Sequence, residues 1–256
     1  GKSDSIDAIA VARAALREGL DALPAAQLEG PELDLRLLVD HREDLVRDRV
    51  AQINRLRWHL HELDPAWDPA PRSLVRFKHL DGLATRLKTM DGTVAWIARD
   101  LVARIRDLTV AANELERRIV EAVAGLAPAL LELAGVGALT AAKIVGEVAD
   151  VRRFRSKDAF ARHNGTAPLP VWSGNTIRHR LSRTGNRQLN AAIHRIAVTQ
   201  MRIHQPAKDY LERRIEMRNT KTEALRALKR RLSDVVFRAL LADADTIGSA
   251  ALEQAA

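Results

Sequence analysis

The chain has 256 residues, of which 46% are hydrophobic, 4% are aromatic and none is cysteine. This excludes a disulfide-bonded scaffold, a thiolate metal site and a cysteine nucleophile, and the length allows one large domain or two modest ones. The core is expected to be aliphatic and helical, because Ala, Leu, Val and Arg dominate the composition. We find no apolar run of about 18 residues and no signal-peptide pattern, so we expect a soluble, cytoplasmic protein that does not enter a membrane.

Positive charge is concentrated in one part of the chain. Residues 151–232 hold 20 Lys and Arg against 5 Asp and Glu, a net charge of +15, whereas the remaining residues hold 21 against 28, a net charge of −7. A basic block on an otherwise acidic chain is typical of a protein that binds a polyanion. We expect nucleic acid rather than a membrane surface, because glycine turns and polar residues interrupt this block.

The chain begins at Gly1 without a methionine, within what looks like a motif, and we expect it to be a fragment. Residues 1–20 form the first predicted helix, with Asp4 and Asp7 three apart on one face of its first turn. Two carboxylates so placed can share a divalent metal ion. The alternative is that acidic residues only favour a helix N-terminus through the helix dipole.

Long helices with heptad spacing dominate the next part of the chain, and we expect them to form a coiled-coil arm. The clearest apolar repeat by seven runs through Leu101, Leu108, Leu115 and Ala122. Two such helices packed antiparallel would form an arm or spacer, which can also be a dimer contact. The segments involved are a long helix (34–63), a proline-rich break (64–72), a shorter helix (73–90) and the heptad helix (about 101–126).

A glycine turn follows the arm. Two short helices over residues 130–150, joined by Gly135 and Gly137 on either side of one valine, predict a helix-hairpin-helix. Its turn would aim backbone N–H groups and a helix N-terminus at a phosphate, and Lys143 adds a cation one turn later. The alternative is a tight helical hairpin in which a glycine only caps the first helix.

A loop over residues 163–187 interrupts the helices, since its glycines and prolines break a helix. Ser173 stands there beside a glycine and is followed by arginines at Arg178, Arg180, Arg183 and Arg187. Arginine binds phosphate oxygens in a bidentate manner, so the loop suits work on phosphate. A solvent-exposed loop with an incidental serine is the alternative, and Ser182 is a second candidate nucleophile.

Two more helices are predicted after this loop. The first begins at Gly185-Asn186 and is ended by Pro206, and the second is a basic helix over about 207–241. The acidic, alanine-rich end of the chain is expected to be frayed.

Several of these motifs resemble those of one family. The start KSDSIDA resembles the last acidic motif of a DEDD-type RuvC-like nuclease domain. The phrases LAGVGALTAAKIVGEV, RFRSKDAFARHNGTAP and SGN followed by RLSRTGNRQLN resemble the C-terminal domain of insertion-sequence transposases. The family is the insertion-sequence 110 family, named jointly with 116 and 902, and the resemblance covers nearly the whole chain in the family's order.

The resemblance implies a DNA transposase or recombinase. Its serine, here Ser173, would attack DNA phosphate and form a phosphoserine link, while RuvC-like acids, here Asp4 and Asp7, would hold Mg²⁺ nearby. Members work as dimers or tetramers, and a structured noncoding RNA guides the choice of DNA. The first Asp and the Glu of the acidic tetrad are absent here, so we expect this chain alone to bind DNA or RNA without recombining it.

The predicted fold is therefore all-α, and the resemblance divides the chain into four parts. These are the end of a RuvC-like domain (1–24), a coiled-coil arm (25–127), a transposase C-terminal domain with the helix-hairpin-helix and the serine loop (128–245), and a frayed tail (246–256).

Other enzyme classes fit the residues poorly. A tyrosine recombinase needs an His-x-x-Arg pair and a late tyrosine, but none of the eight histidines has an arginine three residues on, and Tyr210 is the only tyrosine. A serine hydrolase needs a Gly-x-Ser-x-Gly motif, which Ser173 lacks. The open alternative is a non-catalytic coiled-coil DNA-binding or architectural protein.

Overall fold

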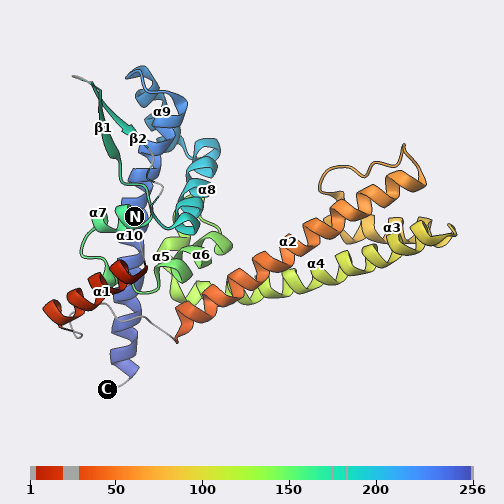
Figure 1. Cartoon of the computed structure of the whole chain (residues 1–256), viewed down its shortest axis with the longest axis horizontal. Helices are drawn as coiled ribbons and strands as arrows, with labels where there is room; N and C mark the ends of the chain where they lie inside the picture. Colours follow the sequence, from red (N-terminus) through yellow and green to blue (C-terminus); the bar gives the residue numbers. More distant parts are fainter. Residues whose placement is uncertain (1–3, 20–28, 174–175, 181, 183, 255–256) are drawn as a thin grey trace.

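The computed structural model describes residues 4–19, 29–173, 176–180, 182 and 184–254. Most of these residues are helical, and the described strands form a single two-stranded sheet. The chain consists of a long arm and a helical body, which Figure 1 shows side by side. In the described part of the chain, no helix combines the length and the apolar character needed to cross a membrane. The predicted all-α class is confirmed.

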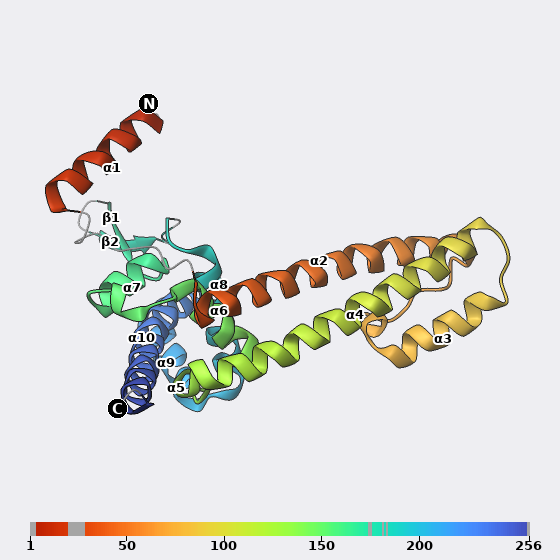
Figure 2. The ribbon, with the colours of Figure 1, turned by 90° about the horizontal axis from the view of Figure 1, so that it is seen from below.

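The arm is a pair of long antiparallel helices. Helix α2 (Pro31–Leu63) runs outward and α4 (Thr93–Leu126) returns along it, as both views show (Figures 1 and 2). The short helices η2 (Ser73–Val75) and α3 (Phe77–Lys88) pack at the far end. Their leucines form a separate core there with those of α2 and α4, which gives the arm its own hydrophobic cluster.

The body is built from short helices packed around one long helix. That helix is α10 (Lys221–Gln254), which contacts several of the others. Its Asp243 carboxylate accepts hydrogen bonds from the backbone N–H groups of Ala129 (2.7 Å) and Leu130 (3.2 Å) and so caps the first turn of α5. The other elements are α5 (Pro128–Leu131), α6 (Ala138–Val148), η3 (Val151–Arg153), α7 (Lys157–His163), β1 (Leu169–Ser173), β2 (Thr176–Arg180), α8 (Arg187–Ile203) and α9 (Gln205–Glu216).

Helix α6 joins the arm to the body. It packs against α2 and α4 on one side and α8 on the other, and one hydrophobic core runs through all of them. A Cβ on Gly146 would lie 2.8 Å from Cβ of Arg36, so only glycine lets α6 approach α2 this closely. The base of the arm is therefore part of the core of the body.

The structure differs from the sequence-based expectations in three places. The predicted loop contains the hairpin β1–β2, and the predicted basic helix is divided into α9 and α10, with Arg218 between them at φ 64°. The last helix, predicted to end near residue 241, continues to Gln254.

Helix α1 (Asp4–Glu18) is present as predicted, but none of its residues is buried. Its large apolar side chains are open to solvent, with Ile6 59% and Ile9 51% exposed.

Candidate functional site

The predicted nucleophile lies at the end of a β-hairpin. Strands β1 and β2 pair antiparallel with Leu169 opposite Arg180 at the base and Ser173 opposite Thr176 at the tip. Gly174 and Asn175, between the strands, lie outside the described residues, as does the side chain of Ser173. Figure 1 shows the hairpin on the side of the body away from the arm. The backbone of Ser173 is thus presented at the far end of a projecting element.

Both ends of the segment that carries this hairpin are fixed to the body. The backbone N–H of Asn186 donates to the carbonyl of His163 at 2.6 Å, and a Cβ on Gly185 would lie 2.5 Å from Cα of Gly165. The Asn186 side chain caps α8 by accepting from the N–H of Leu189 at 2.9 Å. We call His163, Asn164, Gly165, Gly185, Asn186 and Asn190 the hairpin clamp.

Side-chain amides connect the hairpin clamp to helix α10. Asn190 donates through Nδ2 to the carbonyl of Asn164 at 2.7 Å, and the Asn164 side chain donates to Oγ of Ser233 at 2.8 Å. Lys229 donates to Oδ1 of Asn190 at 2.6 Å, and burial, together with the Arg226 charge, lowers the pKa of this lysine. Because Asn164 and Ser233 are fully buried, these bonds fix the base of the hairpin. No pattern in the sequence predicts this network.

The predicted glycine turn is present between α5 and α6. Gly135 has φ +82°, whereas Gly137 has an ordinary φ of −97° and is the N-cap of α6 without a side-chain cap. Gln200 of α8 donates to the carbonyl of Ala134 at 2.7 Å and holds the turn against the body. The N-terminus of α6 follows an exposed residue, Gly137, so it is open to an approaching phosphate.

Lys143 occupies a different environment from the one predicted. Its ammonium is buried and donates to Asp40 at 2.9 Å and to Glu43 at 3.0 Å, both on the arm helix α2. Burial by itself lowers the pKa of Lys143, but the bonds to the two carboxylates outweigh this and raise the pKa above its ordinary value. Lys143 therefore links the body to the arm, and its ammonium is already bonded to two carboxylates.

The predicted arginines fall into two groups. Arg180, at the end of β2, and Arg187, at the start of α8, are both exposed. The side chain of Arg178 and all of Arg183 lie outside the described residues. Ser182 is half-buried and its hydroxyl lies 3.1 Å from that of Thr184. Arg180 and Ser182 also line one cavity.

The predicted metal-binding acids, Asp4 and Asp7, both lie in the first turn of α1 and are exposed. Their oxygens are of the type that a hard divalent cation prefers. No group of three or more metal-binding side chains occurs in the part of the chain that the structure describes. The two acids therefore fit as part of a metal site that needs further ligands.

Comparison with known proteins places the chain among transposases. A model described as "Transposase IS116/IS110/IS902 family" matches residues 127–212, and a DEDD-class model described as "Transposase" matches residues 1–65. The chain belongs to the IS116/IS110/IS902 transposase family. Membership implies DNA binding, and the DEDD-class match implies dependence on a divalent metal.

Two proteins of insertion elements are similar to the chain. The first is the "Insertion element IS116 uncharacterized 44.8 kDa protein" of Streptomyces clavuligerus, at 29% identity over 95% of this chain and 72% of that protein. The second is the "Insertion element IS110 uncharacterized 43.6 kDa protein" of Streptomyces coelicolor, at 34% identity over 46% of this chain and 29% of that protein.

Proposed function

We propose that this insertion-sequence transposase cuts and rejoins DNA with Ser173 as its nucleophile. The observation that carries the proposal is the position of Ser173, at the end of β1 on a hairpin that the hairpin clamp fixes to a basic helical body. A nucleophile needs this combination, because the hairpin brings it to the DNA while the clamp limits its freedom. The family assignment supports the same chemistry.

The proposed step exchanges one phosphoester bond for another. The hydroxyl oxygen of Ser173 attacks phosphorus, the new Oγ–P bond forms, and the P–O bond to the departing strand breaks. The serine proton leaves with a base or water, and the departing oxygen is protonated in turn. A strand hydroxyl reverses the same exchange during rejoining, so ATP is not required. Cations near the phosphate would stabilise the charge that develops in the transition state.

Asp4 and Asp7 would hold a magnesium ion together with further ligands. A bound divalent cation supplies two effects at a phosphoryl centre, which are activation of a hydroxyl and neutralisation of developing charge. A serine hydroxyl is a weak nucleophile without such activation. The two carboxylates are already on one turn of α1, so their own contribution is to hold the ion.

We assign DNA-backbone binding to the glycine turn and to exposed arginines of the body. Gly135 and Gly137 would present the N-terminus of α6 to a phosphate. Arg180 and Arg187 are exposed and would bind further phosphates. Arg178 and Arg183 complete the predicted set. The resemblance to the family also leads us to propose a guide noncoding RNA and a homo-oligomer, dimer or tetramer, formed partly through the arm.

The test is a search for the covalent intermediate. The gene product translated from its start codon is incubated with element-end DNA, the element's noncoding RNA and Mg²⁺, and a protein–DNA adduct that survives denaturation is sought. We expect an adduct that is lost in Ser173→Ala and in Asp4→Ala, with DNA binding kept in both. Tight DNA binding without any adduct would favour the architectural alternative instead.

A further inference from the structure

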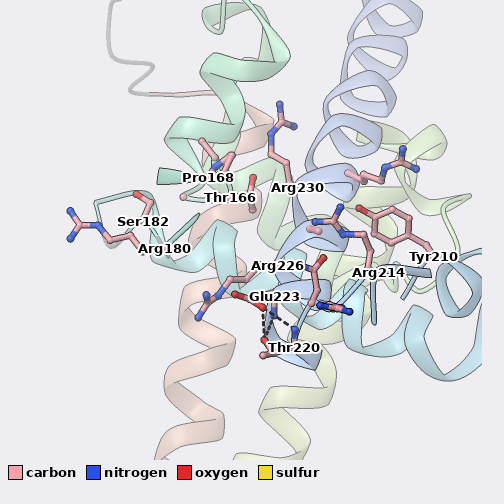
Figure 3. Close-up of a pocket in the computed structure, with 16 residues that line it drawn as sticks. Thr166, Pro168, Arg180, Ser182, Tyr210, Arg214, Thr220, Glu223, Arg226 and Arg230 are labelled. Atoms are coloured by element: carbon pink, nitrogen blue, oxygen red, sulfur yellow. Dashed lines mark hydrogen bonds between the residues drawn. The ribbon is translucent and has the colours of Figure 1, made fainter. Parts of the chain in front are cut away.

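A cavity of about 560 Å³ lies between the base of the hairpin, helix α9 and the first turns of α10. Figure 3 shows its lining side chains converging from these elements. Among the described residues, six arginines line it, against Glu223 as the one acidic residue. We call this cavity the arginine pocket, and its arginines are Arg180, Arg214, Arg218, Arg226, Arg230 and Arg231.

Most of this positive charge is not balanced by carboxylates. Arg230 pairs with Asp158 at 2.5 Å and with Asp234. In the described part of the chain, none of the other five arginines has a carboxylate within 4.0 Å of its guanidinium nitrogens. Glu223 is used in a capping box, where it accepts from the backbone N–H and the hydroxyl of Thr220 at 2.8 and 2.9 Å. The surplus positive charge of the five other arginines makes the pocket suitable for an anion.

Two buried polar atoms from residues that line the pocket lack a hydrogen-bond partner within the described residues. One is Nε of Arg214, which is a donor, and the other is Oδ1 of Asn219, which is an acceptor. A buried polar group without a partner is costly, so a ligand that satisfies both would be favoured. Inorganic phosphate offers mainly acceptors. A nucleotide offers acceptors on its phosphate and sugar and N–H donors on its base, and therefore suits both atoms.

The remaining walls of the pocket are apolar or aromatic. Pro168 and Ala227 contribute apolar surface, and the ring of Tyr210 lies 4.7 Å from the guanidinium carbon of Arg231. The volume is in the usual range of about 300–1,000 Å³ for small-molecule sites. A pocket of this size is too small to hold a base-paired double helix. Enzymes that take a single nucleotide out of a duplex hold it in a pocket of this kind, between apolar or aromatic side chains.

We propose that the arginine pocket binds one unpaired nucleotide of a nucleic-acid strand. Its phosphate is bound by the arginines, and its base lies toward Tyr210 and Asn219. The inference rests on the proposed function in its choice of a nucleic-acid ligand. It adds a site in which Arg180 is the one arginine that was among the predicted phosphate-binding residues.

The hairpin relates the pocket to Ser173. Arg180 pairs with Leu169 and Ser173 pairs with Thr176, so the two ends of the hairpin are four residues apart along each strand. At about 3.3 Å per residue this separation is about 13 Å. The wall of the pocket that Arg180 forms therefore lies about 13 Å from the hairpin tip, a distance that a few nucleotides of one strand can span. If the bound nucleotide belongs to the DNA strand, the arginine pocket would fix the register of that strand relative to Ser173.

The test compares affinity for single strands and for a duplex of the same sequence, by fluorescence anisotropy. The variant is Arg226→Gln with Arg231→Gln, two exposed side chains of the pocket that are not among the arginines assigned to the DNA backbone above. We expect its affinity for single-stranded DNA or RNA to fall at least about tenfold, with less than about a threefold change for the duplex. The salt dependence for single strands should also fall, with the slope reduced by about 0.7 for each phosphate that the variant no longer binds.

A matched control is Arg195→Gln with Arg202→Gln, two exposed arginines of α8 that do not line the pocket. This control should leave the ratio of single-strand to duplex affinity unchanged. In a second measurement, photocrosslinking of thio-substituted DNA and RNA oligonucleotides, with mass spectrometry, should label the peptide that contains Tyr210. The strand that crosslinks identifies DNA or RNA as the source of the nucleotide.

Two results would overturn the inference. One is an equal loss of single-strand and duplex affinity in the pocket variant, which would indicate a general backbone contact. The other is a pocket variant that binds single strands as tightly as a wild-type chain that binds them well. That result would remove the nucleotide site and leave the proposed function intact. If the wild-type chain bound no nucleic acid at all, both proposals would fail.

Discussion

Gly185 and Gly165, twenty residues apart in sequence, lie so close that a Cβ on Gly185 would be 2.5 Å from Cα of Gly165 and 2.8 Å from the carbonyl oxygen of His163. Neither neighbour is a flexible side chain, so both backbone segments would have to move. This contact closes the segment that carries the hairpin, and the position of Ser173 therefore depends on it.

Gly185→Ala should destabilise the protein and loosen the hairpin. Overpacking of this kind costs about 1–3 kcal/mol, and the Asn186–His163 hydrogen bond would be strained as well. Urea unfolding of the purified chain measures the loss. Gly82→Ala is the control, because Gly82 is an exposed helical residue with nothing within 4 Å of the added Cβ. That variant should keep or slightly raise the stability, and equal destabilisation of both variants would contradict the argument.

Lys143→Met should weaken the junction of arm and body. It removes an ammonium that bonds Asp40 and Glu43, and leaves these partly exposed carboxylates without their cation. Hydrogen bonds to charged groups contribute about 1.5–3 kcal/mol each, and the exposure of the two acids places the loss at the low end. Nucleic-acid affinity, measured on the folded variant, should stay the same. A clear loss of affinity would instead support the predicted phosphate contact of Lys143.

The difference in unfolding free energy between wild type and Lys143→Met should depend on pH in one direction. The pKa of Lys143 is raised in the folded chain, so its contribution to the free energy of unfolding is fully present below its ordinary pKa of 10.5. It is lost as the pH rises through the higher folded value. The stability gap between wild type and Lys143→Met should therefore be constant near neutral pH and shrink above about pH 10.5. A gap that widened there would contradict the assignment.

The sequence was sufficient to predict the helical class and the long helices of the arm, because heptad spacing is a local pattern. It was also sufficient to locate the glycine turn. The hairpin was missed, although Gly174-Asn175 between two short β-branched and aromatic runs is a known hairpin signal. The prolines at 168 and 170 and the basic residues favoured a loop instead.

The hairpin clamp and the arginine pocket depend on contacts between distant residues. Asn164 meets Ser233, and Arg180 shares a cavity with Arg226, yet no spacing in the sequence indicates either relationship. The environment of Lys143 was missed for the same reason, since its two carboxylates come from a helix about a hundred residues earlier. Charge composition identified the basic region, but only the fold identifies which arginines converge.

His163 should make the chain less stable in mild acid. Burial, and then the neighbouring Arg153 charge, lower the pKa of His163, and Nη2 of Arg153 donates to its Nε2 at 3.4 Å. The unfolded chain therefore binds a proton more readily, and stability should fall as the pH drops below about 6.5. His163→Gln should reduce this loss of stability when unfolding is measured between pH 7.5 and pH 5. This range spans the ordinary histidine pKa of about 6.5.

His194 is the necessary comparison, because burial, followed by the Lys229 charge, lowers its pKa as well. His194→Gln should reduce the acid effect independently, and the double variant should show the sum of the two reductions. An acid effect that stayed the same in all three variants would show that neither histidine carries it.

Gly137→Ala separates the structural role of the glycine turn from its proposed role on DNA. A Cβ on Gly135 would be strained, since φ is +82° and side-chain atoms of Thr199 and Gln200 lie 3.3 Å away. A Cβ on Gly137 has an ordinary φ of −97° and meets nothing within 4 Å, so the fold should tolerate it with a loss below about 1 kcal/mol. Gly135→Ala should therefore unfold at lower urea concentration, whereas Gly137→Ala should not.

The DNA measurement then gives opposite results for the two interpretations of the turn. If the N-terminus of α6 contacts a phosphate, the methyl group of Gly137→Ala blocks the close approach, and duplex affinity should fall about tenfold, as for the loss of one charge-assisted hydrogen bond. Gly125→Ala, an exposed site on α4 with no atom within 4 Å of the added Cβ, should leave the affinity unchanged. Unchanged affinity in Gly137→Ala would make the turn a purely structural connection between α5 and α6, and DNA binding would then depend on the arginines alone.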